Sequence, residues 1–424
     1  MILKTYGHAT LSFEVDEKPF LITDPWLIGS CYWRSWWLQH YPSEKDLAVL
    51  KNTDIIFLTH EHWDHAHFPT LKKFFKNKKI LIPKLNSKRL KVSLEKDFSV
   101  TELEPYKWID NNQIKILSIP LWNDDSILLF NWNNYLVCNL NDSKPTHSIL
   151  TSILNFKKKN NFKLILLQSY APASIVNSFR NEQSGIVSIK EKEDYIGYVK
   201  KTCSYLQADF FIPFASQAIY SRPDSIWANK HKVTDIELNS NWAESTKLLK
   251  SYSFFDLKYN NSYSYVKSYQ KSENMDALAK KEYDAGIERD YSIDDLNIFS
   301  KITNPGRYLL FILYPFGLNF KFKNIFYNFN FLKGKFFPLI SKKKSKHYFS
   351  MPVKEFYESS LNGHFTDTGT SFILKIYLKN KLNIFQSYML FIILTFSEKG
   401  YFSNLKMFFS QFLVIYRNFN SRPL

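Results

Sequence analysis

Cysteine and long apolar runs are both scarce in this chain. Its 424 residues include three cysteines, Cys31, Cys138 and Cys203, which are too few for a disulfide framework and lack the paired spacing of a metal site. The longest largely apolar run covers nine residues, 388–396, whereas about 20 are needed to span a bilayer. Residues 1–6 lack the charged start and apolar stretch of a signal peptide. We therefore expect a reducing, cytoplasmic location.

Acidic residues are scarce toward the C-terminus. From Lys301 onward there are 18 lysines and arginines but only 4 aspartates and glutamates, so +14 of the net charge of +17 lies there and the first 300 residues carry +3. Such a surface suits phosphorylated ligands, anionic lipid or nucleic acid. The alternative is a compositional bias in which the charges only solvate the surface. We expect a small phosphorylated substrate and peripheral membrane contact through this basic region, and no nucleic acid.

The length of the chain allows two or three domains with sizeable cores. Residues 1–235 contain several apolar, strand-like runs and form the first predicted domain. Residues 236–303 are polar and charged, which predicts a helical connector or cap. Beyond the turn at Asn304–Gly306, residues 304–424 predict a small α+β domain that is basic and rich in aromatic residues.

One stretch of the first domain carries the chemistry. The apolar run Ile55–Leu58 predicts a buried strand, and His60, His62, Asp64 and His65 follow it closely. On extended backbone, side chains two residues apart point the same way, so His60, His62 and Asp64 could converge on one point. Imidazole and carboxylate groups suit zinc, iron or manganese. The alternative is a polar loop whose histidines cluster by chance.

This H-x-H-x-D-H pattern resembles the metal-binding signature of the metallo-β-lactamase superfamily. The resemblance implies a four-layer αββα sandwich with one or two divalent metal ions at one edge. It implies that His60 and His62 hold a first metal and that Asp64 and His65 hold a second. Asp142, at the end of the strand-like residues 135–142, matches the aspartate that bridges the two metals. The alternative for Asp142 is a cap or turn residue.

The resemblance also assigns supporting roles. His8 and Asp24 match residues that brace the ligand loop from behind, although His8 could equally be a hydrogen-bonded core histidine. The residues themselves suggest a substrate surface in the aromatic loop that contains Arg34, Trp36 and Trp37, since arginine pairs with phosphate and tryptophan stacks on rings. The alternative is a lid that only packs over the core. Arg222 is predicted either to bind a substrate phosphate or carboxylate or to be a surface arginine.

A narrower resemblance covers roughly residues 1–235. The segments Asp24–Gly29, Trp36–Leu38, His60–His65 and Pro213–Ala215 are similar to the catalytic half of the CMP-N-acetylneuraminate hydroxylase family. That family oxidises the N-acetyl group of a nucleotide-activated sialic acid, so the similarity implies a nucleotide-linked amino sugar as substrate. The family also carries a Rieske iron–sulfur domain, whose cysteine–histidine pairs are not found here. An oxygenase would then need a separate electron donor.

This sequence lacks two histidines that the superfamily pattern contains. One is expected near residues 120–125, where Asp124 and Asp125 stand instead. Either could substitute as a ligand, and the alternative is a solvated loop carboxylate. The other is expected after the strand-like residues 209–215, where Ser216 and Gln217 follow. The second metal position is therefore short of a ligand, and a single metal is an alternative to a pair.

Three function classes remain open from the sequence. In a hydrolase, a metal-bound water attacks an ester, lactone or phosphodiester, with Asp64, His65 and Asp142 as catalytic residues. In an oxygenase, the same cluster holds iron. In the third class the site has lost its metal and the chain is a binding scaffold, against which the intact H-x-H-x-D-H motif argues. We expect a metal-dependent enzyme.

Overall fold

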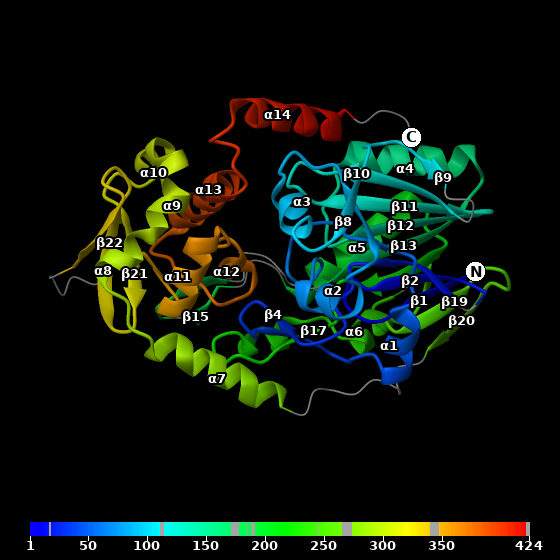
Figure 1. The fold of residues 1–424 in the computed structure, drawn as a ribbon, viewed down its shortest axis with the longest axis horizontal. Coiled ribbons are helices and arrows are strands. Elements are labelled where there is room, and N and C mark those ends of the chain that lie inside the picture. Colours follow the sequence, from blue (N-terminus) through cyan, green and yellow to red (C-terminus); the bar gives the residue numbers. More distant parts are fainter. Residues whose placement is uncertain are drawn as a thin grey trace.

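A computed structural model describes residues 1–16, 18–110, 114–170, 178–183, 185–187, 191–242, 244–264, 274–339 and 347–420. Within this part of the chain, two large sheets lie face to face in a sandwich, and a third sheet lies beside them in a C-terminal unit (Figure 1). The helix α14 (Leu405–Phe419) extends from the C-terminal unit back over the sandwich. No helix among the described residues is long and apolar enough to cross a membrane.

The first sheet holds the start of the chain and the metal motif. Its strand order is β20-β19-β1-β2-β3-β6-β7-β8. The strands are β1 (Ile2–Thr5), β2 (Leu11–Val15), β3 (Lys18–Thr23), β6 (Ile55–Phe57), β7 (Lys79–Pro83), β8 (Ser99–Leu103), β19 (Ser253–Asp256) and β20 (Asn261–Ser264). β2 and β3 form an antiparallel hairpin, and β6 lies parallel to β3.

The second sheet ends in the strand that carries Asp142. Its strand order is β18-β16-β13-β12-β11-β10-β9. The strands are β9 (Ile109–Asp110), β10 (Lys115–Pro120), β11 (Ser126–Trp132), β12 (Tyr135–Asn141), β13 (Lys163–Ser169), β16 (Phe210–Phe214) and β18 (Lys247–Leu248). All seven residues of β12 are buried, as expected for a central strand covered on both faces.

The sandwich has four layers: two sheets packed face to face, each covered by helices on its outer side. One apolar cluster fills the space between the sheets, where the rings of Phe13 and Phe130 lie 4.2 Å apart. A second cluster packs helices on the outer face of the first sheet, and a third does so on the second sheet. The outer helices are α1 (Glu44–Leu50), α2 (Phe68–Phe74), α3 (Arg89–Leu94), α4 (His147–Lys159) and α5 (Lys192–Leu206). The predicted αββα sandwich is therefore confirmed.

The C-terminal unit is α+β, as predicted. Its sheet has the order β15-β14-β25-β24-β21-β22-β23, with β14 (Phe179–Asn181), β15 (Gly185–Ile186), β21 (Leu318–Phe322), β22 (Ile325–Asn330), β23 (Lys335–Pro338), β24 (Tyr348–Ser350) and β25 (Lys375–Tyr377). The helices around it are α7 (Met275–Glu288), α8 (Ile293–Leu296), α9 (Ser300–Thr303), α10 (Arg307–Leu313), α11 (Val353–Asn362), α12 (Asp367–Thr370) and α13 (Lys381–Glu398). Its core is rich in phenylalanine, with Phe299, Phe320 and Phe356 at the centre.

The sheets do not follow the predicted domain boundaries at residues 235 and 303. The segment after the short helix α6 (Asp235–Ser240) was expected to be a helical connector, but β18, β19 and β20 extend the two sandwich sheets. These strands are short and partly exposed. The sequence around them is polar, so they could not be recognised as strands from the sequence alone. In the other direction, β14 and β15 pair with the C-terminal sheet. The two parts of the chain are therefore interleaved.

The aromatic loop after β3 also forms a small sheet. β4 (Ser30–Cys31) and β5 (Trp36–Leu38) pair with β17 (Ala218–Tyr220). Between β4 and β5, Tyr32, Trp33 and Arg34 all have positive φ values, from 50° to 60°. Three successive non-glycine residues in this region are unusual, and the loop that they form contacts the metal motif.

Candidate metal centre

The H-x-H-x-D-H motif does not continue the strand before it. β6 ends at Phe57, and residues 60–66 form bends and turns. The amides of His65 and Ala66 donate to the carbonyl of His62 at 3.0 and 2.8 Å. The alternation expected of extended backbone is therefore lost, and His60, His62 and Asp64 do not converge on one point. The motif instead divides between two neighbouring groups of ligand atoms.

The first group consists of His60, His62 and Asp142, whose ligand atoms all lie within 4.8 Å of one another. Nε2 of His60 is 2.8 Å from Nδ1 of His62 and 3.9 Å from Oδ1 of Asp142. His60 is buried, whereas the side chains of His62 and Asp142 are 40% and 28% exposed. This group is therefore the side of the centre that solvent can reach.

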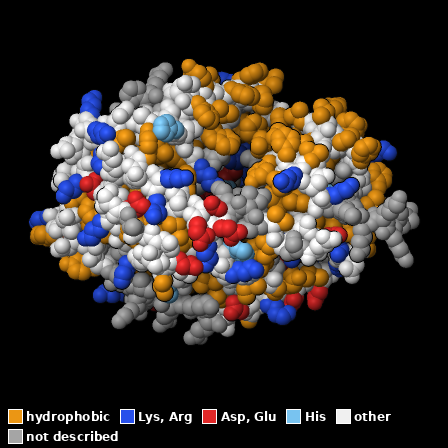
Figure 2. Space-filling view, turned by 180° about the vertical axis from the view of Figure 1, so that it is seen from behind, with side chains coloured by type: hydrophobic (Ala, Val, Ile, Leu, Met, Phe, Trp, Pro, Cys, Tyr) orange, Lys and Arg blue, Asp and Glu red, His pale blue; other side chains and the backbone are white. Residues whose placement is uncertain are grey.

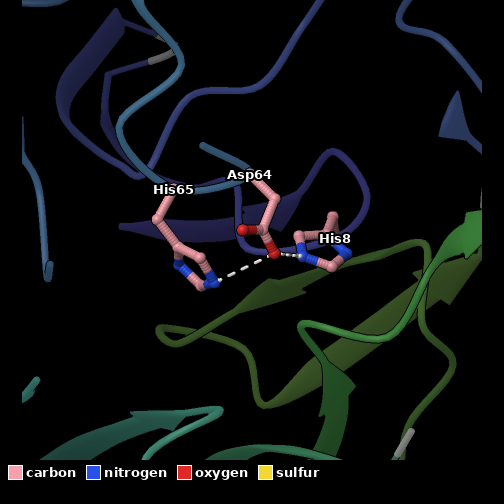
Figure 3. A group of neighbouring side chains, drawn as sticks. All are labelled: His8, Asp64 and His65. Atoms are coloured by element: carbon pink, nitrogen blue, oxygen red, sulfur yellow. Dashed lines mark hydrogen bonds and ion pairs between the residues drawn. The ribbon is translucent and has the colours of Figure 1, made fainter. Parts of the chain in front are cut away.

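The second group consists of His8, Asp64 and His65, all buried (Figure 3). Oδ2 of Asp64 lies 2.7 Å from Nε2 of His8 and 3.4 Å from Nε2 of His65. The geometry thus places His8 beside two predicted ligands and not behind them. His8 follows β1 in a left-handed turn, in which Gly7 has φ +98° and a Cβ on Gly7 would lie 2.9 Å from the ring of Tyr252.

Asp142 lies between the two groups. Its Oδ1 is 3.9 Å from Nε2 of His60 and 3.7 Å from Nε2 of His65. The pairing of β12 with β13 shifts register between Asn139 and Asn141, and Asn141 has φ +55°. This irregularity at the end of β12 directs the next residue toward the motif, as bulges beside active sites do.

Two buried atoms at this junction support cation binding. Within the described structure, neither Nε2 of His65 nor Oδ1 of Asp142 has a hydrogen-bond partner. Buried polar atoms are nearly always satisfied, and exceptions call for an explanation such as an ion. Imidazole nitrogen and carboxylate oxygen are ligands of zinc, iron and manganese. The residues present therefore fit divalent cations.

Asp24 fixes the orientation of His65 from behind. Oδ2 of Asp24 is 3.0 Å from Nδ1 of His65 and accepts hydrogen bonds from the Thr59 hydroxyl and the Asn141 side-chain amide, at 2.6 and 2.7 Å. Its Oδ1 accepts from the backbone amide of Thr59 at 2.7 Å. A carboxylate on one ring nitrogen turns the other toward a metal. The supporting role predicted for Asp24 agrees with this geometry.

Three further residues brace the ligands and were not assigned from the sequence. The Tyr32 hydroxyl donates to Oδ1 of Asp64 at 2.6 Å. The Thr59 hydroxyl is 3.1 Å from Nδ1 of His60, and Asn141 holds Asp24. Thr59 and Asn141 each adjoin a predicted ligand in the sequence, which is a usable signal. Tyr32 comes from a different loop and gives none.

Charge and burial act in opposite directions on these groups. Burial, reinforced by the neighbouring His65 and His62, holds the pKa of His60 well below its usual value, so His60 is neutral and able to bind a metal. Burial would also lower the pKa of His65, but the carboxylates of Asp64 and Asp142 outweigh it and raise that pKa well above normal. Burial would raise the pKa of Asp64, but His65 and His8 hold it well below normal. A compact charge pair therefore occupies the second group.

The two aspartates that stand where a histidine was expected are both buried, not solvated. Asp125 lies behind His60, with Oδ1 3.3 Å from Nδ1, and neither metal-ligand group includes it. Burial and the nearby Asp142 raise its pKa well above normal, which favours its neutral form. Asp124 binds the hydroxyl of Tyr401 and the ammonium of Lys399, away from the ligands.

Of the four predicted substrate residues, three are buried and one is partly exposed. Trp36 and Trp37 are 4% and 3% exposed, so they pack in the core and present no stacking surface. Arg222 is fully buried and pairs with Asp224 and Glu355, at 2.9 and 2.6 Å, so it is neither a surface residue nor a free phosphate ligand. Arg34 is 39% exposed and lies 3.8 Å from Glu282. Aromatic and arginine side chains serve cores as readily as ligands, which is why the sequence did not separate these roles.

Comparisons with known proteins show which sequences and structures the chain is similar to. The model of the "Beta-lactamase superfamily domain" matches residues 2–139. Cytidine monophosphate-N-acetylneuraminic acid hydroxylase of the pig, Sus scrofa, is 42% identical over 66 residues, which is 16% of this chain and 15% of that protein. The hydroxylase of the hamster Cricetulus griseus is 41% identical over 66 residues, or 12% of its length. This chain therefore spans a small part of the curated relatives that it matches.

Two solved structures resemble this chain over part of its length. Isothiocyanate hydrolase from Delia radicum gut bacteria has a TM-score of 0.42 and 14% identity, covering 61% of this chain and 99% of the other. CmlA, a diiron β-hydroxylase from Streptomyces venezuelae, has a TM-score of 0.39 and 15% identity, covering 60% of this chain and 54% of the other. Residues 2–139, which contain the H-x-H-x-D-H motif, are thus similar to the beta-lactamase superfamily domain.

Proposed function

We propose that this chain is a metal-dependent enzyme whose centre binds two divalent cations. His60, His62 and Asp142 would hold one, and His8, Asp64 and His65 the other. The observation that carries the proposal is the position of Asp142. Its Oδ1 accepts no hydrogen bond from the described residues and faces a histidine of each group at 3.9 and 3.7 Å. A shared carboxylate between two histidine-containing groups suits a bridged pair. The roles of the individual ligands stay predictions.

Bound cations would supply Lewis acidity and an acidified water molecule at neutral pH. The side chains of the protein would determine how substrate approaches the centre and which group accepts its proton. Tyr32, Trp36 and His8 enclose the Asp64 side, so substrate must approach past the partly exposed His62 and Asp142. Asp142 is the more exposed of the two ligand carboxylates, and it is the group best placed to accept a proton from the reacting molecule.

The substrate class that we propose is a nucleotide-linked amino sugar. The support is the short match to hydroxylases that act, by their names, on cytidine monophosphate-N-acetylneuraminic acid. The basic balance of the chain suits a phosphorylated molecule. Arg34 is the remaining candidate for a phosphate contact, since it is partly exposed and only loosely paired with Glu282.

Hydrolysis of an ester, lactone or phosphodiester is the second candidate. The His-rich first group with an exposed bridging carboxylate suits zinc as well as iron. The metal that the protein retains separates the two reactions, because oxygen chemistry needs a redox metal and hydrolysis does not. A hydroxylase would also require an electron donor, which we propose is a separate protein.

The test begins with elemental analysis of protein purified without oxygen. His60→Ala should lose metal, whereas His147→Ala should retain it, because His147 is an exposed histidine on α4 that contacts Tyr205. Metal content equal in all three proteins, or absent from all three, would refute the proposed centre.

The second step tests the substrate with the same three proteins. Each is incubated with CMP-N-acetylneuraminate, with and without iron, oxygen and a reductant, and the products are identified by mass spectrometry. Addition of one oxygen atom supports hydroxylation, and release of the nucleotide supports hydrolysis. An unchanged sugar nucleotide under every condition would refute the substrate class while leaving the metal centre standing.

A further inference from the structure

The amphipathic helix α14 exposes a stripe of apolar side chains to solvent. Five large apolar side chains recur along it with helical spacing and lie between 50% and 71% exposed: Leu405, Phe409, Phe412, Tyr416 and Phe419. This spacing places them on a single stripe. A surface helix normally buries that stripe against the core, whereas here the stripe faces outward.

The face of α14 that meets the sandwich carries two buried polar residues. Gln411 and Asn418 are the buried residues of the helix. Asn418 accepts from the amide of Trp122 at 2.8 Å and donates to the carbonyl of Pro120 at 3.1 Å. Gln411 accepts from the side-chain amide of Asn86 at 2.6 Å. The orientation of the helix is thus fixed by satisfied polar contacts, and rotation to hide the apolar stripe would break them.

The apolar surface continues beyond α14. Figure 2 shows hydrophobic side chains gathered along the top of the molecule, where Figure 1 places α14, and down over the neighbouring C-terminal unit. On α10, on α13 and in the turn after α10 the exposed members are Tyr308, Leu309, Ile312, Phe316, Leu382, Phe385 and Ile392. α10 packs against α13, and Phe396 of α13 contacts Phe408 of α14. An exposed apolar surface that extends over several helices indicates a site of contact with another protein or with a membrane.

We propose that this face, formed by the outer sides of α10, α13 and α14, docks the protein on an anionic membrane surface. Charge decides in favour of lipid: residues from Lys301 onward carry 18 basic and 4 acidic side chains. Exposed Lys406 and Arg417 flank the α14 stripe, where their ammonium and guanidinium groups could reach lipid headgroups while the stripe enters the interface. A second copy of the chain, itself at +17, would be repelled by the same charges.

The docking mode is peripheral. No described helix can span a bilayer, and α14 has the length and the one-sided aromatic composition of a helix that lies in the plane of the membrane interface.

The test is co-sedimentation of the full-length protein with vesicles. One set contains phosphatidylcholine alone, and in the other phosphatidylserine replaces a third of it. We expect binding to the anionic vesicles that weakens with added salt, as for any contact between basic side chains and anionic headgroups. Absence of binding to anionic vesicles, or equal binding to both sets, would overturn the proposal.

Matched variants locate the surface. The variant Phe409→Ser/Phe412→Ser/Tyr416→Ser should reduce the partition constant at least about tenfold. The control Ile236→Ser/Tyr259→Ser/Tyr263→Ser removes three comparably exposed apolar side chains on the sandwich, and it should bind as the unmodified protein does. All six side chains are exposed, so both variants should fold, which circular dichroism checks. Unchanged binding by the α14 variant would overturn the proposal. So would a dimer, seen by light scattering, that the α14 variant abolishes.

Discussion

Asp367 brings a carboxylate from the C-terminal unit to the metal motif, with Oδ1 4.0 Å from Nε2 of His62. The other ring nitrogen of His62 faces His60 at 2.8 Å, so Asp367 stands on the outer side of a predicted metal ligand. His364 lies 3.1 Å from the second carboxylate oxygen of Asp367 and steadies it. The C-terminal unit therefore contributes to the site and is more than an appendage.

Replacing Asp367 by asparagine should weaken metal binding. A carboxylate near the outer nitrogen of a histidine ligand raises the basicity of the ring. At 4.0 Å Asp367 acts on His62 through its charge and not through a hydrogen bond, so we expect a loss of up to about tenfold in affinity. Competition for Zn²⁺ with a chelator measures the effect. Asp294→Asn, at an exposed position on α8, is the control and should leave affinity unchanged. Equal affinities for the two variants would show that Asp367 does not act through His62.

Asp24→Asn should both destabilise the protein and loosen the site. Asp24 is fully buried, and its carboxylate accepts from the Thr59 amide, the Thr59 hydroxyl and the Asn141 amide. The side-chain NH2 group of an asparagine would face at least one of these three donors, and that hydrogen bond would be lost. We expect a loss of about 2–4 kcal/mol in the free energy of unfolding, together with lower metal content.

Chemical denaturation and elemental analysis check this expectation. Asp54→Asn serves as the control, because Asp54 is half exposed and forms a surface ion pair with Lys18 at 3.2 Å. Its effect should stay below about 1 kcal/mol. A variant at position 24 as stable as this control would mean that the hydrogen bonds around Asp24 do not hold the loop.

The strands and the motif could be predicted from the sequence because their signals are local. β6 and β12 are apolar runs that end beside His60 and Asp142, and the hairpin of β2 and β3 has its turn between two such runs. The division of the motif between two groups of ligands came from the family resemblance. In these cases a few consecutive residues carry the information.

The unpredicted parts depend on contacts between distant segments. His8 joins Asp64 because a left-handed turn after β1 brings it there, and Asp367 reaches His62 from the other end of the chain. Arg222 was expected to be either a ligand or a surface residue, yet Asp224 and Glu355 neutralise it in the interior. Residue type does not reveal such partners, because the same side chain serves either role.

Stability should depend on pH through Glu398, which lies partly buried at the end of α13. Burial, together with nearby Asp367, raises the pKa of Glu398 from its usual 4.5 to about 7. The folded protein therefore binds a proton that the unfolded chain releases. The resulting stabilisation is complete below about pH 4.5 and is lost as pH rises toward 7. The loss should be on the order of 3 kcal/mol.

Glu398→Gln should remove this dependence. An amide oxygen can still accept from the backbone amide of Phe365, a contact of 2.6 Å, and it carries no charge. Relative to the unmodified protein, the variant should gain stability between about pH 4 and pH 8. Denaturation at several pH values measures the difference, with exposed Glu193→Gln as the control. A difference that does not change with pH would contradict the prediction.

Arg222→Leu should destabilise the junction between the sandwich and the C-terminal unit. The guanidinium donates to Asp224 at 3.0 and 2.9 Å and to Glu355 on α11 at 2.6 Å. Removing one member of a buried charge cluster leaves the others unpaired, which typically costs about 3–5 kcal/mol. Adding Glu355→Gln to the variant should restore part of the stability, because one uncompensated charge is then removed. Thermal unfolding of the single and double variants tests this, and a single variant as stable as the unmodified protein would show that Arg222 is not the link between the two parts.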